Sequence, residues 1–311
     1  GLATDSAFVN SWTFDSNSNT SYAGQGNHNL SVADADGDGR DEIIYGAAAI
    51  DDNGTGLWNT RVGHGDAMHV GDLDPSRPGL EMFKVNENGS QPSSVFVDLR
   101  TGSIIWRTNP AGDNGRGVSG DIYAGSPGAE SWSSAESTMR NPTGGSAGSK
   151  PGSANFLSWW DGDPVRELLD GTRITKYNGG TPLSGSGVAS NNGTKSTPAL
   201  SGDIVGDWRE EVIWRTSDNR ALRIYSTPNV TSTRIPTLLH DPMYRVALAW
   251  QNTAYNQPPH PSFHIGNWMN PAPWPNVYVP GGTTTTQQTT TTTRQQTTST
   301  TMTTAPRTTT T

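Results

Sequence analysis

The sequence has no cysteine, few helix-forming runs and no apolar run long enough to cross a membrane. Without cysteine it has no disulfide, no cysteine nucleophile and no zinc site built on thiolates. Its formal net charge of −8 argues against a nucleic-acid backbone as a partner. Glycine (36), proline (21) and tryptophan (11) are abundant instead, which favours an all-β fold with many turns. We therefore expect neither a membrane nor a nucleic acid among the partners.

An acidic stretch stands out in the first part of the chain. Asp34, Asp36 and Asp38 occupy alternate positions, a glycine follows, and Glu42 opens an apolar run. Oxygen ligands at the first, third and fifth positions of a short loop can converge on Ca²⁺, and glycine permits the sharp turn. No glutamate stands at the twelfth loop position and no helical pattern flanks the loop, so it is not an EF-hand. The stretch predicts a calcium loop that leads into a strand; the alternative is a solvated acidic turn.

The same pattern, an acidic loop followed by a glutamate and an apolar strand, recurs along the chain. Further copies occupy residues 71–83, 120–132, 160–169 and 202–214, roughly 40 to 50 residues apart, which is the spacing expected of β-propeller blades. Each blade is a small sheet that cannot bury both faces alone and must stack on its neighbours. The prediction is an all-β propeller of which five to six blades are visible in residues 1–282.

We assign the acids of these loops to structural calcium ions that pin the edges of the blades. The expected ligands are Asp34, Asp36, Asp38, Glu42, Asp72, Asp74, Glu81, Asp203 and Asp207. The copies around Asp121 and Asp161 have lost the spacing, so we do not count on an ion there.

The tail, residues 283–311, is almost entirely threonine with some glutamine, arginine and proline. Such a composition cannot bury a core and is typical of disordered, O-glycosylated stalks of secreted proteins. We expect a secreted, extracellular protein in which this linker leads to a tethered carbohydrate-binding module beyond the C-terminus. The chain begins with Gly1 rather than methionine and shows no signal peptide, so we expect a processed or fragmentary N-terminus.

Five contiguous stretches, residues 22–34, 63–69, 191–195, 206–214 and 249–260, closely resemble the family 11 polysaccharide lyases, the rhamnogalacturonan lyases. The resemblance implies an eight-bladed, calcium-rich β-propeller. It also implies cleavage of rhamnogalacturonan I, a component of pectin, between rhamnose and galacturonate by β-elimination, which leaves unsaturated galacturonyl ends. Members of the family are roughly twice as long, so this chain looks like a C-terminal half. We expect it to be a monomer.

Elimination from galacturonate removes a weakly acidic proton next to a carboxylate. It needs a cation to neutralise the developing charge and a base to take the proton. His28, His64, Asp66 and Glu87 are candidates for one calcium site, and the resemblance favours them. From the residues alone, histidine is an unusual ligand of calcium, so the alternatives are hydrogen-bonded turn histidines and a solvated acid.

Three asparagines are candidates for a calcium site close to the substrate. Amide oxygens bind calcium without overcharging a site that must also accept an anionic sugar, and the resemblance favours Asn192, Asn252 and Asn256 in this role. The run that contains Asn192 is also a turn by propensity alone.

Lys195 is the predicted base. A lysine beside calcium and an arginine would have two positive neighbours, which favour its neutral form; a solvated surface lysine is the alternative. Arg116, flanked by glycines, could fork onto a uronate carboxylate or share the base role, or it could make a surface ion pair. Tyr255 could stack on a sugar or donate a hydrogen bond to it, with core packing as the alternative.

Two other interpretations remain open. Acidic loops of this kind also occur in non-catalytic propellers that bind a cell-wall polysaccharide or a protein, although that leaves the motif around Lys195 without a purpose. A quinone-dependent dehydrogenase propeller rests only on a hairpin near Thr101 and is weak. The connector from Trp106 to Arg116 is short, whereas exo-acting relatives carry an added loop, so we expect endo action.

Overall fold

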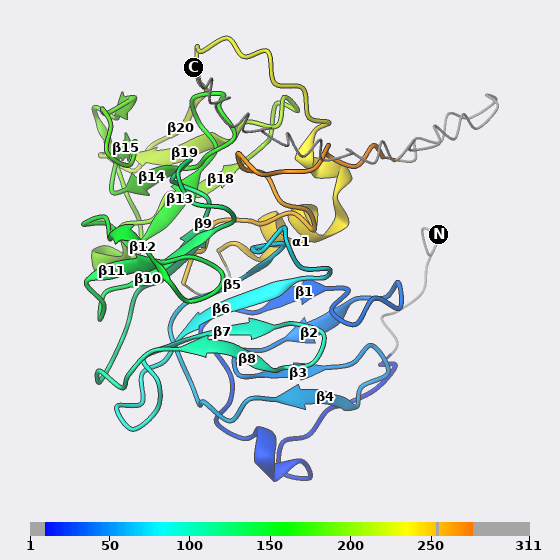
Figure 1. Cartoon of the computed structure of the whole chain (residues 1–311). Helices are drawn as coiled ribbons and strands as arrows, with labels where there is room; N and C mark the ends of the chain where they lie inside the picture. Colours follow the sequence, from blue (N-terminus) through cyan, green and yellow to red (C-terminus); the bar gives the residue numbers. More distant parts are fainter. Residues whose placement is uncertain (1–9, 253–254, 276–311) are drawn as a thin grey trace, which may run out of the picture. The chain divides into compact units, whose positions relative to one another are not determined.

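The computed structural model describes residues 10–252 and 255–275 (Figure 1). Within them, short strands form five antiparallel sheets of four strands each. In the first four sheets the strands pair in chain order, so each sheet is a simple meander. The prediction of an all-β chain built from repeated small sheets is confirmed. The linker predicted over residues 283–311 lies outside the described residues.

The bounds of the elements are as follows. Sheets one to three comprise β1 (Ser31–Ala33), β2 (Glu42–Ile44), β3 (Ala48–Ile50) and β4 (Gly56–Asn59); β5 (Met68–Gly71), β6 (Glu81–Val85), β7 (Ser94–Asp98) and β8 (Ile104–Arg107); β9 (Gly117–Gly120), β10 (Glu130–Ser133), β11 (Thr138–Arg140) and β12 (Ser146–Ser149). Sheets four and five comprise β13 (Phe156–Ser158), β14 (Glu167–Asp170), β15 (Arg173–Thr175) and β16 (Leu183–Ser184); β17 (Val188–Ala189), β18 (Leu200–Gly202), β19 (Glu211–Thr216) and β20 (Leu222–Tyr225). The described helices are η1 (Thr20–Tyr22), η2 (Gly193–Lys195), η3 (Leu238–His240) and α1 (Pro242–Trp250).

One glutamate holds each acidic loop closed. In every sheet it opens the strand that follows the loop and pairs with the last residue of the strand that precedes the loop. Its Oε2 accepts two backbone N–H groups of the loop in between, at 2.7 to 3.4 Å. The five residues are Glu42, Glu81, Glu130, Glu167 and Glu211, and all are buried. The repeated glutamate of the sequence is therefore the residue that satisfies the backbone of the turn.

Neighbouring sheets share apolar cores, because side chains alternate between the two faces of a strand. In β13, Phe156 joins the core shared with the fifth sheet, while Leu157 joins the core shared with the third. Leu168 and Leu169 of β14 divide in the same way. The fourth sheet thus buries apolar side chains on both faces, as predicted for sheets that cannot be stable alone.

A tryptophan at the outer strand fixes each of two sheet-to-sheet contacts. Trp58 of β4 donates its Nε1–H to Leu99 O at 2.7 Å and covers Gly102, where a Cβ would lie 2.7 Å from the ring. Trp106 of β8 donates to Pro142 O at 3.1 Å and covers Gly144 in the same manner. A glycine is needed at both turns because of this close approach and because φ is positive there.

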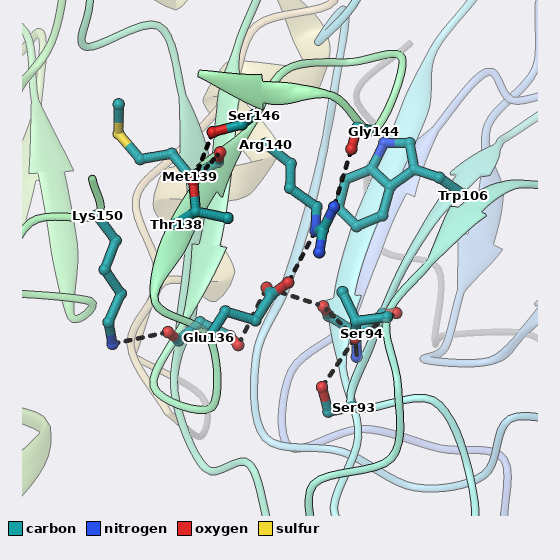
Figure 2. A network of polar contacts seen from close by, with 12 residues as sticks. Ser93, Ser94, Trp106, Glu136, Thr138, Met139, Arg140, Gly144, Ser146 and Lys150 are labelled. Carbon is teal, nitrogen blue, oxygen red and sulfur yellow. Dashed lines mark hydrogen bonds and ion pairs between the residues drawn. The ribbon is translucent and has the colours of Figure 1, made fainter. Parts of the chain in front are cut away.

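Figure 2 shows the polar contacts around the second of these tryptophans. Glu136 binds Arg140 Nε at 2.8 Å and also accepts the hydroxyl of Ser94 in β7 at 3.2 Å. Arg140 donates to Gly144 O at 2.9 Å, and its guanidinium lies 5.8 Å from the centre of the Trp106 ring. Glu136 and Arg140 thus neutralise each other where the third sheet packs against the second, so neither charge is left unpaired in this contact.

Helix α1 packs beside the fifth sheet. Asp241 caps its N-terminus by accepting Tyr244 N–H at 2.8 Å, which satisfies one of the unpaired donors of the first turn. The hydroxyl of Tyr244 donates to Glu210 at 2.7 Å and accepts Asp203 N–H at 2.9 Å. At 9 residues α1 is short, and no helix in the described part of the chain has the length and apolarity of a membrane span.

Candidate functional site

The predicted ligands outside the acidic loops, among them His28, Asp66 and Glu87, lie at the opposite edge of the sheets. His28 precedes β1 and Asp66 precedes β5, whereas Glu87 follows β6. Because these strands pair antiparallel, the start of a first strand and the end of a second strand lie at the same edge. The acidic loops join the other ends of those strands. Strands of 4 to 5 residues, roughly 15 Å long, therefore separate the two kinds of site.

The structure brings four of the predicted ligands together. One ring nitrogen each of His28 and His64 and one carboxylate oxygen each of Asp66 and Glu87 lie within 4.8 Å of one another; we call these residues the His–acid cluster. His28 Nε2 is 3.3 Å from Asp66 Oδ1, and His64 Nε2 is 3.8 Å from Glu87 Oε2. The two imidazole rings meet edge to face with centroids 4.7 Å apart.

The donors of the His–acid cluster fit a metal ion. The hydrogen bond between Asp66 and Glu87, together with burial, raises the pKa of Glu87 to about 7. Burial opposes ionisation of Asp66, but its hydrogen bonds with Glu87 and Lys195 outweigh burial and lower its pKa. Asp66 Oδ1 is buried and has no hydrogen-bond partner among the described residues. A divalent cation would neutralise the two carboxylates and satisfy that oxygen.

Two residues that the sequence analysis did not single out shape this cluster. Lys84 in β6 is fully buried, and its Nζ donates to Gly63 O at 2.9 Å, to Val85 O at 3.3 Å and to Asn86 Oδ1. Burial lowers the pKa of Lys84 to about 7. Gly65 lies so close to β6 that a Cβ would be 1.9 Å from Val85 O. The position of Lys84 inside an apolar strand could have indicated its role from the sequence. The contact of Gly65 with β6 could not, because it arises only when the chain folds.

Lys195 lies in the loop that connects β17 and β18 of the fifth sheet. β17 and β18 both pair with β19, and residues 190–199 leave the sheet between them and return. Lys195 Nζ reaches Asp66 Oδ2 at 2.6 Å, also donates to Gly115 O, and lies 4.2 Å from the centre of the Tyr255 ring. The predicted base is therefore beside the His–acid cluster. Its charged neighbour in the structure is the carboxylate of Asp66 rather than the predicted arginine.

Arg116 and Tyr255 take different positions around Lys195. The Tyr255 ring lies between Lys195 and His28, with its centroid 4.3 Å from that of His28. Arg116 follows the glycine that Lys195 contacts, but its guanidinium donates to Asn155 Oδ1 of the neighbouring sheet. The structure thus places Tyr255 in direct contact with two predicted site residues and Arg116 one residue away from such a contact.

The three predicted asparagine ligands differ in what their amides already bind. The Asn192 amide donates to Thr197 Oγ1 at 2.8 Å. Asn256 donates to Pro198 O at 2.9 Å and to Asn252 Oδ1 at 3.2 Å. Asn256 is 1% exposed, and its Oδ1 has no hydrogen-bond partner in the described structure. Asn256 therefore offers the clearest vacant oxygen of the three.

The first acidic loop gathers a second group of candidate metal ligands. Oxygens of Asp34, Asp36 and Glu42 lie within 4.8 Å of one another. Glu42 is completely buried, and its Oε1 has no partner within the described residues, so these oxygens also fit a cation. Asp38 is not in this group, and its Oδ1 accepts Arg40 N–H at 2.9 Å instead.

The second and fifth loops do not gather three such ligands in the described part of the chain. Asp72 Oδ2 accepts His264 N–H at 3.0 Å, and Asp203 Oδ2 accepts Leu238 N–H at 2.8 Å. Both aspartates therefore bind segments that follow the last sheet. This docking is a contact that their spacing in the sequence did not predict.

The other predicted ligands of these two loops bond mainly within their own loops. Asp74 accepts Ser76 N–H at 3.1 Å, Glu81 closes its loop as described above, and Asp207 pairs with Arg209. Calcium binding at Asp72, Asp74, Glu81, Asp203 and Asp207 stays a prediction.

A lysine occupies the fourth loop. Asp161, Asp163 and Glu167 form a further group with oxygens within 4.8 Å of one another. Lys176 Nζ binds the carboxylates of Asp161 and Asp163 and lies 3.2 Å from Glu167 Oε1. Its ammonium group supplies the positive charge there, in a copy of the repeat for which no ion was counted on.

The geometry defines a class of protein: an all-β domain of packed four-stranded sheets, with acidic loops at one edge and a histidine–carboxylate cluster beside a lysine at the other. The family described as rhamnogalacturonan lyase family 11, C-terminal domain, matches residues 3–275. The chain belongs to this family.

Relatives and solved structures agree with this assignment. The chain is 52% identical to rhamnogalacturonan endolyase YesW of Bacillus subtilis over 86% of this chain and 44% of YesW. It is 52% identical to rhamnogalacturonan exolyase YesX of the same organism over 87% of this chain and 48% of YesX. The crystal structure of YesW superposes with a TM-score of 0.83 at 51% identity over 87% of this chain and 48% of that one. A Bacillus licheniformis rhamnogalacturonan lyase of family 11 gives 0.83 at 52% identity over 86% and 47%. The chain thus spans about half the length of these relatives.

Proposed function

We propose that this chain provides the catalytic part of a calcium-dependent rhamnogalacturonan lyase. The substrate would be rhamnogalacturonan I, cleaved between rhamnose and galacturonate by β-elimination. The observation that carries the proposal is the contact of Lys195 with Asp66, at 2.6 Å, beside a cluster of candidate metal ligands. The relatives' names supply the substrate.

The cluster and the lysine divide the chemistry between them. His28, His64, Asp66 and Glu87 would hold Ca²⁺, with Asn256 Oδ1 available for a second ion close by. Bound calcium would neutralise the uronate carboxylate and the charge that develops on it during elimination.

Lys195, as a neutral amine, would take the proton from C5 of galacturonate, next to the carboxylate. The electron pair forms the C4–C5 double bond, the C4–O bond breaks, and the rhamnose oxygen takes up a proton. Tyr255, which contacts both Lys195 and His28, would position the sugar over the site. Arg116 would bind a uronate carboxylate after leaving Asn155.

The propeller is also part of the proposal. Trp12 donates to Asp52 O at 2.7 Å and covers Gly54, which repeats the contacts of Trp58 and Trp106 with the sheets that follow them. Trp12 therefore holds the position that a fourth-strand tryptophan of a further sheet would hold. This repetition supports a ring of such sheets, eight in the family that the sequence resembles.

Incubation of the chain with rhamnogalacturonan I and calcium tests the function. Ultraviolet absorbance should report new unsaturated uronates, a chelator should stop their formation, and polygalacturonate without rhamnose should give none. The proposal of endo action predicts a fast fall in viscosity before small products accumulate. Tight binding of the polysaccharide with no product would instead favour a non-catalytic binding propeller and would overturn the lyase proposal for this chain.

A further inference from the structure

A pocket of about 400 Å³ adjoins the His–acid cluster. The rings of Phe14, Tyr22 and Tyr45 line it, and His64 lines it from the side of the cluster. None of the three rings is among the residues assigned so far to metal binding or catalysis. Its volume is within the range of sites that hold one small ligand.

The pocket opens at the same edge of the sheets as the His–acid cluster. Tyr45 directly follows β2, just as Glu87 follows β6 after one intervening residue. Gln25, a lining residue, accepts Gly63 N–H at 3.0 Å through its Oε1 and so ties the pocket wall to the loop that carries His64. A ligand in the pocket would therefore lie beside the metal ligands.

The aromatic walls are held in place. Phe14 and Tyr22 meet edge to face with centroids 5.1 Å apart. Gly26 lies against the Tyr45 ring, where a Cβ would be 2.4 Å from Cε1, yet the Tyr45 residue is still 46% exposed. The Tyr45 ring is thus accessible on one side and held by Gly26 on the other. This lowers the entropy cost of binding a flat apolar surface.

The chemistry of the lining selects a neutral sugar. The described lining residues include no lysine, arginine, aspartate or glutamate, and His64 is the single residue among them that can carry charge near neutral pH. Apart from His64 and a cation held at the His–acid cluster, the described lining offers a galacturonate carboxylate no counter-charge. A 6-deoxyhexose offers a methyl group and an apolar ring face to the aromatic walls, and its hydroxyls can reach water through the opening.

A row of rings connects the pocket with the predicted base. His64 touches His28 at 4.7 Å between centroids, His28 touches Tyr255 at 4.3 Å, and Lys195 Nζ lies 4.2 Å from the Tyr255 centroid. One polysaccharide chain could therefore lie along this row with a galacturonate at Lys195 and a nearby residue in the pocket. We propose that the pocket between Tyr45 and His64 is a subsite for the neutral deoxyhexose, rhamnose, of the chain that Lys195 attacks. This inference rests on the proposed function, because the alternation of rhamnose and galacturonate belongs to that substrate.

Saturation-transfer NMR with L-rhamnose alone as the probe tests the subsite in the calcium-loaded protein, with D-galacturonate as a second probe. We expect saturation of the rhamnose methyl protons in the unaltered chain and in Tyr45→Phe. Tyr45→Ala should reduce the affinity about two- to tenfold, as for a lost aromatic contact. Tyr123→Ala is the matched control, since Tyr123 is 39% exposed and lies in the loop between β9 and β10 at the opposite edge. In the cleavage assay Tyr45→Ala should raise KM for rhamnogalacturonan I by a similar factor and leave kcat within about twofold.

The outcomes separate the two proposals. If the chain cleaves the polysaccharide but rhamnose binding is unchanged in Tyr45→Ala, or is not detected at all, the subsite is wrong and the lyase proposal stands. Rhamnose contacts that depend on Tyr45 in a chain that forms no unsaturated product would support the subsite and overturn the lyase. A pocket that prefers galacturonate to rhamnose would overturn the assignment of the sugar.

Discussion

Lys195 and Asp66 are 129 residues apart in the chain, yet the lysine Nζ lies 2.6 Å from Asp66 Oδ2. The contact joins the loop between β17 and β18 to the loop before β5 and brings the predicted base to the candidate metal ligands. Asp66 is shared between the two roles, since its other oxygen faces His28 at 3.3 Å. Because Lys195 is not one of the four candidate ligands, a change at Lys195 tests proton transfer separately from metal binding.

Lys195→Ala should lower kcat/KM for rhamnogalacturonan I by about 10²- to 10⁴-fold, because the group that takes the proton is lost. Calcium affinity, measured by titration calorimetry, should change by much less, since the four ligands of the His–acid cluster remain. Far-ultraviolet circular dichroism controls for folding. A variant that keeps the normal rate would show that another group is the base.

Gly65→Ala should disrupt the His–acid cluster without removing any ligand. The new Cβ would be 1.9 Å from Val85 O and 2.7 Å from Lys84 Nζ, so the loop with His64 and Asp66 must move. Overpacking of this kind costs about 1–3 kcal/mol of stability. We expect a lower melting temperature and at least tenfold weaker calcium binding at the cluster.

Gly152→Ala is the matched control for that experiment, because a Cβ there meets nothing within 4 Å. It should leave both the melting temperature and the calcium affinity unchanged. Equal calcium affinity in Gly65→Ala and Gly152→Ala would contradict the idea that this glycine holds the ligands in place.

Lys176→Ala should turn the fourth acidic loop into a calcium-dependent one. The lysine pairs with Asp161, Asp163 and Glu167, and its removal leaves three carboxylates close together. Burial disfavours its charge, but hydrogen bonds to Asp161 and Asp163 outweigh burial and raise its pKa. A lysine with a raised pKa stabilises the fold at every pH below its unfolded value of 10.5, so the loss should be visible at neutral pH.

The measurement is thermal unfolding at pH 7 with a chelator and with millimolar calcium. With chelator the variant should be less stable by about 1–3 kcal/mol, because the buried Glu167 loses its partner. Calcium should restore much more stability to Lys176→Ala than it adds to the unaltered chain. An equal effect of calcium on both proteins would show that the loop cannot accept an ion.

Several features of the fold were readable in the sequence because they repeat. A glutamate follows each acidic loop and opens the next strand, and in the structure it closes the loop each time. The His–acid cluster could be predicted from the residues only as a set of unusual ligands, and the resemblance to a family was needed to bring His28 and Glu87 together. Local spacing cannot show that residues from two neighbouring sheets come together in one cluster.

Other features depend on contacts that leave no local pattern. Gly65 is essential only because β6 passes behind it, and Asp72 binds His264 from a segment 192 residues away. Lys176 follows its loop by enough residues that nothing in the spacing connects the two. In each case the partner is brought in by the packing of whole sheets, which a single sequence does not specify residue by residue.

Glu130→Gln should change how stability depends on pH. Glu130 is completely buried; its Oε2 accepts Ile122 N–H and Tyr123 N–H, and its Oε1 has no partner in the described structure. Burial, with the nearby Asp121, raises the pKa of Glu130 to about 8 from 4.5. The folded state thus holds a proton that the unfolded state releases, and the stability from this proton is complete below pH 4.5 and is lost as the pH rises towards 8. The slope for one such proton is about 1.4 kcal/mol per pH unit. Glutamine keeps the acceptor oxygen and cannot ionise. The melting temperature, measured with chelator between pH 5 and 8, should therefore fall less steeply with rising pH in the variant than in the unaltered chain. Parallel curves would show that Glu130 does not carry this proton in the folded protein.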